Sequence, residues 1–309
     1  MSGITLRAGD TRALVLPDEG GVAAELSVGA FDVLARTPWA ASARPAPVPA
    51  EDEATWVGRW RGGWQLCFPT AGAADPDARP RQGFHGVASQ DAWTVRRVGE
   101  SSAELAWADE AGLSAARRWS IGAGTLGAVT TAVNGGADAR RIIVAEHLVL
   151  GQDVLAHLTE ADGTLGIQAS GTLAELDYAG NPTGRATAWP GHGWDRANRS
   201  TPARVAALQH PVPRVITVTG PHLRATVSWE GLEHALLWEE FGASREAPWG
   251  GAVHALGVEP TSTPHGAGTA HPGGIVELGP GESMTWATRL DLQVTERTTL
   301  TRPVKGERR

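Results

Sequence analysis

The 309-residue sequence contains a single cysteine, Cys67. One cysteine excludes an internal disulfide and is compatible with a reducing compartment. Its neighbours Leu66 and Phe68 make a short apolar run that Pro69 ends. The thiol is therefore expected to pack in a core rather than to act as a nucleophile.

Lysine is nearly absent, and the formal net charge is −7 at pH 7. An acidic chain is a poor partner for nucleic acid or for an anionic membrane. No stretch approaches the roughly 20 consecutive apolar residues that span a bilayer. The N-terminal residues also lack the apolar core of a signal peptide. These absences predict a cytoplasmic protein without a nucleic-acid or membrane partner.

Glycine and proline are frequent, at 39 and 20 residues, and they separate many short apolar or alternating runs. Such runs, bounded by turn residues, are typical of strands in an all-β sandwich or barrel. The predicted strands are 13–16, 22–28, 31–34, 66–68, 93–98, 103–107, 113–121, 126–133, 141–150, 165–168, 214–219, 223–229, 234–238, 253–260, 274–278 and 284–294.

Other segments predict different local structure. Residues 134–136 (NGG) are typical of a β-hairpin turn. Residues 56–64 are expected to carry one helical turn, and residues 178–213 to form loops. The length fits one large β domain or two ordinary ones, but no change in composition marks a boundary. The sequence therefore predicts one large, twisted β-sandwich over residues 1–294, followed by a frayed, polar and basic tail, 295–309.

Thirteen tryptophans stand beside one tyrosine and four phenylalanines. The indole ring suits a core and also suits stacking on the C–H face of a sugar. Most are expected in the core, and those beside turns are the better candidates for a pocket: Trp39, Trp64, Trp93, Trp189, Trp194 and Trp249.

Three polar residues are candidates for chemistry. His85 lies in a loop between Gly83 and Gly86, and imidazole exchanges a proton near neutral pH. His147 interrupts an apolar run, and Glu259 ends an apolar strand just before a proline. Burial of that carboxyl group would raise its pKa. A structural role stays open for each: a hydrogen-bonded loop histidine, a buried histidine and a solvated strand end.

The ordered set of motifs resembles the aldose 1-epimerase (galactose mutarotase-like) superfamily, as a divergent member. The matches are Leu16-Pro17, Gly20-Gly21, 32–34 (DVL), 63–72 (GWQLCFPTAG), His85-Gly86, Trp93, a strand ending at Asn134, the strand of His147, 257–260 (GVEP) and 278–283 (LGPGES). They are spread over about 270 residues in the family's order.

This resemblance implies a β-supersandwich of antiparallel sheets with the three polar residues in one cleft. It implies that Glu259 takes the proton of the anomeric hydroxyl and that His147 gives a proton to the ring oxygen. His85 would polarise the sugar near the same oxygen. Paired acid and base on one hemiacetal suit these residue types. Such a reaction requires no metal and no cofactor, and the expected partner is a small-molecule sugar or modified sugar.

Departures from the family pattern leave the sugar open. Ala73 stands where many mutarotases carry an arginine, which Arg61, Arg79 or Arg81 would have to replace. Leu148 and Val149 replace an aromatic pair, and Val87 replaces a glycine. The substrate-binding aspartate has two candidates, Asp177 and Asp195. The further predicted sugar contacts are Trp64, Trp93, Trp238 and His265.

Four alternatives stay open. A carbohydrate-binding protein could keep the cleft without chemistry, and a hexose-phosphate mutarotase would need convergent cations from Arg59, Arg61, Arg79 and Arg81. The three polar residues could instead bind a metal, although their spacing lacks close ligand pairs. A lyase or another epimerase on the same fold is the fourth alternative.

Overall fold

The computed structural model describes residues 3–42, 50–76, 78, 80–160, 163–191 and 193–295. Within these ranges, eleven strands form one sheet, named here sheet A. In spatial order it contains β1 (Ile4–Ala8), β2 (Thr11–Leu16), β3 (Val22–Val28), β5 (Trp64–Cys67), β11 (Ala145–Leu150), β20 (His254–Thr261), β19 (His234–Phe241), β16 (Arg204–Gln209), β13 (Thr172–Leu176) and β14 (Pro182–Ala188), with β4 (Phe31–Asp32) paired to β3.

Nine described strands form a second sheet, named sheet B, and a short pair lies apart from both sheets. Sheet B contains, in spatial order, β15 (Arg196–Ala197), β12 (Leu165–Gln168), β17 (Val215–Thr219), β18 (Leu223–Glu230), β22 (Ser283–Val294), β9 (Thr125–Asn134), β8 (Leu113–Gly122), β7 (Ser102–Ala108) and β6 (Thr94–Val98). The separate pair is β10 (Arg140–Ile142) with β21 (Val276–Leu278).

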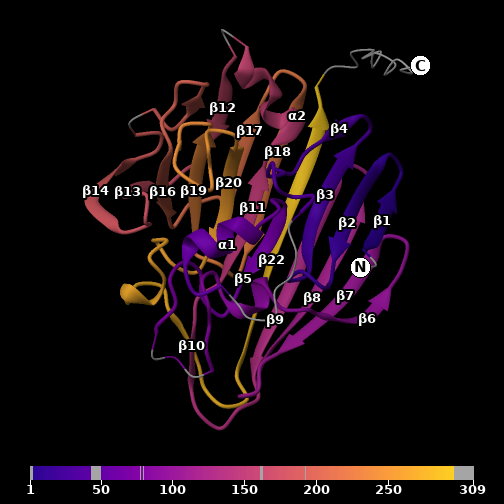
Figure 1. Ribbon diagram of the computed structural model, residues 1–309, viewed down its shortest axis with the longest axis vertical. Coiled ribbons are helices and arrows are strands. Elements are labelled where there is room, and N and C mark those ends of the chain that lie inside the picture. Colours follow the sequence, from indigo (N-terminus) through magenta and orange to yellow (C-terminus); the bar gives the residue numbers. More distant parts are fainter. Residues whose placement is uncertain are drawn as a thin grey trace.

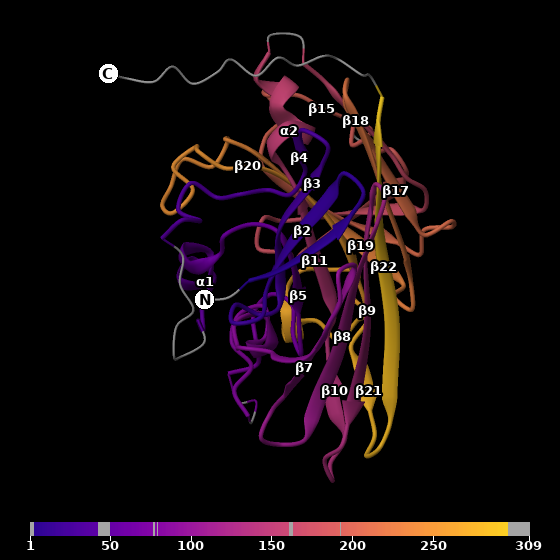
Figure 2. The same ribbon diagram turned by 90° about the vertical axis from the view of Figure 1, so that its right-hand side faces the viewer.

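The two sheets form two layers, which Figure 2 shows from the side. Alternate residues of each strand face the interior, as the repeating pattern of buried and less buried residues along β8 illustrates. Side chains from both sheets make one apolar core between the layers. The antiparallel sandwich predicted from the turn-bounded runs is therefore confirmed.

A charged pair lies inside this core. The Glu146 carboxylate on β11 accepts two hydrogen bonds from Arg117 on β8, at 2.8 and 2.7 Å. The indole nitrogens of Trp64 and Trp286 each donate to the same carboxylate, at 2.7 Å. A buried charge is tolerated only when it is paired and hydrogen-bonded, as here. The pair ties sheet A to sheet B and fixes which face of β11 points inward.

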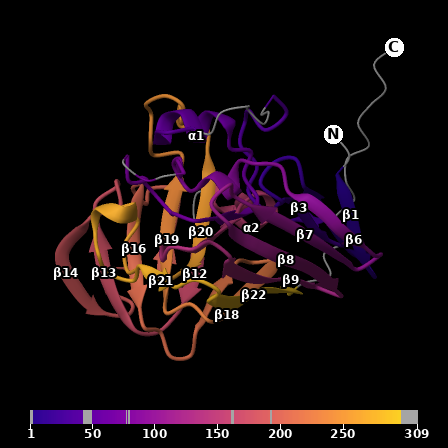
Figure 3. The same cartoon turned by 90° about the horizontal axis from the view of Figure 1, so that it is seen from below.

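Helix α1 (Glu53–Arg59) covers the outer face of sheet A, the face turned away from sheet B (Figures 1 and 3). Asp52 caps its N-terminus, because the side chain accepts a hydrogen bond from the backbone N–H of Thr55 at 2.8 Å. Trp56 and Trp60 lie four residues apart, so both turn toward the sheet. The remaining helices are α2 (Gln152–Leu155) and the 3₁₀ turns Val87–Ser89, Ala156–Thr159 and Gly268–Ala270. Among the described residues, none of the helices has the length and apolar content that crossing a membrane requires.

Two local predictions are wrong. Asn134 does not open a hairpin, because its amide donates to the carbonyls of Asp138 and Leu278, and β10 pairs with β21 instead of β9. Residues 178–213 are not all loop, since they contain β14, β15 and β16. Pairing with β12, β13 and β19 makes strands of segments that carry little strand signal themselves. The tail from residue 296 lies outside the described residues, and a single domain over 1–294 stays a prediction.

Candidate active site

A cavity of about 560 Å³ opens on the outer face of sheet A, beneath α1. Its wall is mostly aromatic, and its titratable lining is acidic or histidine. The aromatic lining residues are Trp56, Trp60, Phe84, Tyr178, Trp238 and Trp249. The titratable ones, apart from Tyr178, are Glu51, Asp52, Glu53, His85, His147 and Glu259. All three residues predicted to carry chemistry therefore reach one cavity.

Strand register brings His147 and Glu259 together. In the antiparallel pair β11–β20, Ala145 lies opposite Thr261 and Val149 lies opposite Gly257. The residue midway on each strand is His147 on β11 and Glu259 on β20, so the two are cross-strand neighbours. Because successive side chains alternate, His147 points away from the core that holds Glu146. His147 Nε2 lies 3.9 Å from Glu259 Oε1.

A glycine makes the room for the Glu259 carboxyl group. Gly257 stands two residues earlier on β20, on the same face of the sheet. A Cβ added there would come within 2.3 Å of Glu259 Oε1. The carboxyl group thus lies back over its own strand, where burial raises its pKa to about 8.

His85 is held in one orientation by Gly72. The backbone N–H of Gly72 donates to His85 Nδ1 at 2.8 Å, and the backbone N–H of His85 donates to the Gly72 carbonyl at 3.0 Å. An Nδ1 that accepts leaves Nε2 to carry the proton in the neutral ring. His85 has a φ of 57°, and Gly86 follows with a φ of 77°, where a Cβ would meet the Phe68 carbonyl oxygen at 2.1 Å. The loop therefore fixes a neutral N–H donor.

Indole rings surround the two histidines. The Trp56 ring lies 4.6 Å from the His85 ring and 5.7 Å from the His147 ring, measured between centroids. Trp60 lies edge-on to His147 at 5.5 Å. This apolar surrounding lowers the pKa of His147 to about 4, and burial followed by the proximity of His147 lowers the pKa of His85. Both imidazoles are therefore neutral near pH 7.

Glu259 and His147 together hold one proton between pH 4 and 8. Burial disfavours charge on both groups, so the pair is either carboxylic acid with neutral imidazole or, after one proton transfer, carboxylate with imidazolium. At 3.9 Å the two atoms are too far apart for a direct hydrogen bond. Two neighbouring oxygens of one hemiacetal, its hydroxyl and its ring oxygen, could each exchange a proton with one of the two groups. The pair can therefore give and accept a proton in one step.

Four of the predicted sugar contacts do not line the cavity. Trp64 is fully buried against Glu146, and the Trp93 indole donates to the Ala88 carbonyl inside the core. Arg61 pairs with Glu19 through two hydrogen bonds of 2.5 and 2.9 Å. Asp195 lies near the end of sheet B, where its carbonyl accepts from Ile167.

The other predicted contacts lie at or near the cavity. Trp238 lines it. Asp177 is bound by Asn181 in a turn whose residues 178–181 line the cavity, although Asp177 itself does not. His265 is buried beside the lining residue Gly266, with its Nε2 3.1 Å from the Gly273 carbonyl. Of the six tryptophans selected for their position beside turns, Trp249 alone is in the cavity lining. Arg79 lies outside the described residues.

Sequence reasoning missed most of the aromatic wall. Trp56 is on α1, Trp60 is the residue that caps the C-terminus of this helix, and Phe84 and Tyr178 are on loops. A signal for the first two existed, since an N-cap aspartate precedes a pair of tryptophans spaced four residues apart. No local pattern marks Phe84 or Tyr178 as cavity residues.

The cavity residues are not arranged as a metal site. Among the described residues, one group of histidine and carboxylate side chains brings three ligand atoms within 4.8 Å of one another. This group is His210, Glu233 and His234, and it does not include a cavity residue. His85 Nδ1 is also engaged by the Gly72 N–H. The arrangement favours proton transfer over ligation.

Comparison with known proteins identifies the fold. No family model and no curated protein sequence matches the chain. Solved structures do match over nearly the whole length. The Slr1438 protein from Synechocystis has a TM-score of 0.71 at 17% identity, covering 95% of this chain and 96% of its own. A galactose mutarotase-like protein from Lactobacillus casei has a TM-score of 0.70 at 15% identity, covering 94% and 100%.

A third match is a GalM/aldose epimerase homologue from Caenorhabditis elegans, with a TM-score of 0.64 at 16% identity and coverage of 96% and 99%. The protein is thus an all-β supersandwich. Its fold is the galactose mutarotase-like fold, as the sequence motifs predicted.

Proposed function

We propose that the protein interconverts the anomers of a sugar by acid/base ring opening, with Glu259 and His147 as the proton-exchanging pair. The observation that carries the proposal is their placement: two buried groups, 3.9 Å apart across neighbouring strands, in a cavity on a galactose mutarotase-like fold. Burying a carboxyl group and an imidazole costs stability, and pairs of buried groups with shifted pKa values are typical of functional sites.

These two residues suffice for the proton transfers. The reactive form of the pair is the one in which the shared proton has passed from Glu259 to His147. The Glu259 carboxylate then takes the proton of the anomeric hydroxyl, the bond from the anomeric carbon to the ring oxygen breaks, and the carbonyl forms. The ring oxygen takes the proton of the His147 imidazolium. Rotation about the first carbon–carbon bond and reclosure return each proton to its origin. Each positioned acid or base typically contributes ~10²–10⁴-fold.

His85 has a different role from His147 in this proposal. Its Nδ1 is bound to Gly72, so its Nε2–H remains as a donor. A neutral donor fixed by its loop is suited to hold an oxygen of the sugar, as oxyanion-hole donors do. It is less suited to release its proton, since a neutral imidazole is a very weak acid. His85 is therefore the polarising residue.

The lining supports an uncharged sugar over a sugar phosphate. Phosphate recognition needs converging arginines or lysines, and the described lining residues include neither. Glu51, Asp52 and Glu53 add negative charge to the wall near α1, although Arg81 pairs with Glu51 at 3.1 Å. The tryptophan faces suit the C–H face of a sugar ring.

Exchange NMR on glucose, galactose and glucose 6-phosphate tests the proposal. The protein should accelerate anomer exchange of a free sugar, and Glu259→Gln should abolish at least 99% of that acceleration. Glu230→Gln, at an exposed position on β18, is the matched control and should keep full activity. Unchanged exchange of every sugar, or full activity in Glu259→Gln, would refute the proposal. Thermal stabilisation by a sugar without faster exchange would favour a carbohydrate-binding protein instead.

A further inference from the structure

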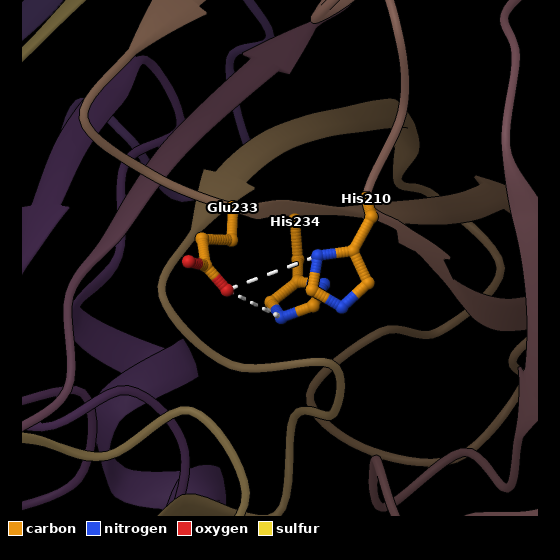
Figure 4. A group of neighbouring side chains, drawn as sticks. All are labelled: His210, Glu233 and His234. Carbon is orange, nitrogen blue, oxygen red and sulfur yellow. Dashed lines mark ion pairs between the residues drawn. The ribbon is translucent and has the colours of Figure 1, made fainter.

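A second group of titratable residues lies where β16 ends and β19 begins. Gln209 and His234 are opposite each other in this antiparallel pair. His210 therefore follows the last residue of β16, and Glu233 precedes the first residue of β19. Figure 4 shows the three side chains of His210, Glu233 and His234 turned toward one another. Two neighbouring strands thus contribute to one cluster.

The distances in the cluster leave room for an ion. Glu233 Oε2 lies 3.8 Å from His210 Nδ1 and 4.0 Å from His234 Nε2. All three ligand atoms lie within 4.8 Å of one another. Zinc bonds of about 2.0–2.2 Å in a tetrahedron separate neighbouring ligand atoms by roughly 3.4 Å. Each imidazole nitrogen would have to move about half an ångström closer to Glu233, and the two imidazole nitrogens would have to approach each other by at most about 1.4 Å. Movements of this size are within the reach of the exposed His210 and Glu233 side chains.

The local backbone and burial favour ligation over a solvated arrangement. His210 has a φ of 47°, an uncommon conformation for a residue other than glycine, and its ring lies 4.5 Å from the His234 ring. His234 is buried, and its Nε2 is the ring nitrogen that faces Glu233. A buried imidazole facing an exposed imidazole and a carboxylate gives one fixed ligand and two adjustable ones.

The surrounding charges set the expected affinity. Arg214 and His265 lie close enough to His234 to interact with it electrostatically. The nearby arginine disfavours an added cation, so the affinity should be moderate rather than that of a closed structural zinc site.

We propose that His210, Glu233 and His234 bind one divalent transition-metal ion, with Zn²⁺ the best match. Two imidazoles and one carboxylate leave a fourth position for water. This donor set prefers Zn²⁺, Co²⁺ or Ni²⁺ over the hard ions Mg²⁺ and Ca²⁺, which take oxygen ligands.

The site would act on the cavity wall from a distance. His234, Leu236 and Trp238 alternate onto the same face of β19, and the last two line the cavity. An ion held across β16 and β19 would join the ends of the two strands that form this wall. It would not contact a substrate at Glu259, so the proposal does not depend on the anomer-exchange reaction.

Metal titration of the EDTA-stripped full chain tests the site. Isothermal titration with Zn²⁺ should show one saturable site per chain, and Mg²⁺ should show none. His210→Ala and Glu233→Gln change exposed side chains and should each weaken Zn²⁺ binding at least tenfold. His234→Ala should weaken Zn²⁺ binding as well, but it replaces a buried residue. If this variant does not fold, His210→Ala and Glu233→Gln still test the site.

Two control variants separate this site from other histidines. His254→Ala removes an exposed histidine that pairs with the far end of β19, and His147→Ala removes one from the cavity. Both should bind Zn²⁺ like the wild type. The d–d absorption of Co²⁺ should report a four-coordinate site that His210→Ala loses. Absence of a saturable site, wild-type binding by both His210→Ala and Glu233→Gln, or loss of binding in His147→Ala would overturn the proposal.

Discussion

Replacing Gly257 by alanine should displace the Glu259 carboxyl group without unfolding the protein. The new Cβ would lie 2.3 Å from Glu259 Oε1 and 3.1 Å from the Trp238 Cβ. An ordinary carbon–oxygen contact is about 3.3 Å or longer, so Oε1 must move by roughly 1 Å. The oxygen is the free end of a flexible side chain, and the contact with Trp238 needs only a few tenths of an ångström. The strand should therefore stay in place while the carboxyl group turns away.

The size of the effect follows from the demands of proton transfer. A misplacement of about 1 Å can cost ~10²-fold in rate. A factor of 10² corresponds to about 2.7 kcal/mol of activation free energy. A carboxyl group pushed toward the open cavity would also regain water. The pKa of Glu259 should therefore fall from about 8 toward the ordinary range.

The assay combines anomer exchange with a measurement that does not need activity. Exchange NMR on the sugar that the wild type accelerates most should show a loss of about 10²-fold, and carbon-detected NMR of the Glu259 carboxyl group should show the lower pKa. Gly166→Ala is the matched control, because it is a strand glycine of sheet B whose added Cβ has its nearest atom at 3.8 Å. A folded Gly257→Ala protein with full exchange activity and an unchanged Glu259 pKa would refute this account of the site.

Three further predictions concern proton binding and the core. Anomer exchange should have a bell-shaped pH profile with limbs near pH 4 and 8, because His147 and Glu259 are both protonated below pH 4 and both deprotonated above pH 8. A flat profile between these two pH values would contradict the shared proton. The free energy of unfolding, measured by urea denaturation, should fall in the wild type relative to Glu259→Gln as pH rises from about 4.5 to about 8. The reason is that a raised pKa means that the native state binds the proton more tightly than the unfolded chain does. If the free energies of the two proteins changed with pH in parallel, the raised pKa would be contradicted. Glu146→Ala should lose about 3–5 kcal/mol by leaving Arg117 charged and buried, whereas Arg289→Ala at an exposed ion pair should lose less than about 1 kcal/mol; equal losses would contradict the role given to the core pair.

Local sequence carried the information on strands and on the three central residues. Alternating runs closed by glycine and proline predicted most strands of both sheets, because side-chain period and turn chemistry act over a few residues. His85 and Glu259 were found for the same reason: each lies at a point where a run is interrupted. The motif order then predicted the fold, which the solved structures match.

The sequence by itself determined an all-β chain of many short strands and the residue types available for acid/base chemistry. The tertiary structure alone decided which face of β11 His147 occupies, since the inward position of Glu146 depends on Arg117 from sheet B. It also decided the aromatic wall and the strands hidden in residues 178–213, because these depend on pairing and packing between residues far apart in the chain. The pKa values of His147 and Glu259 belong to the same category: burial sets them, and burial is a property of the assembled sheets.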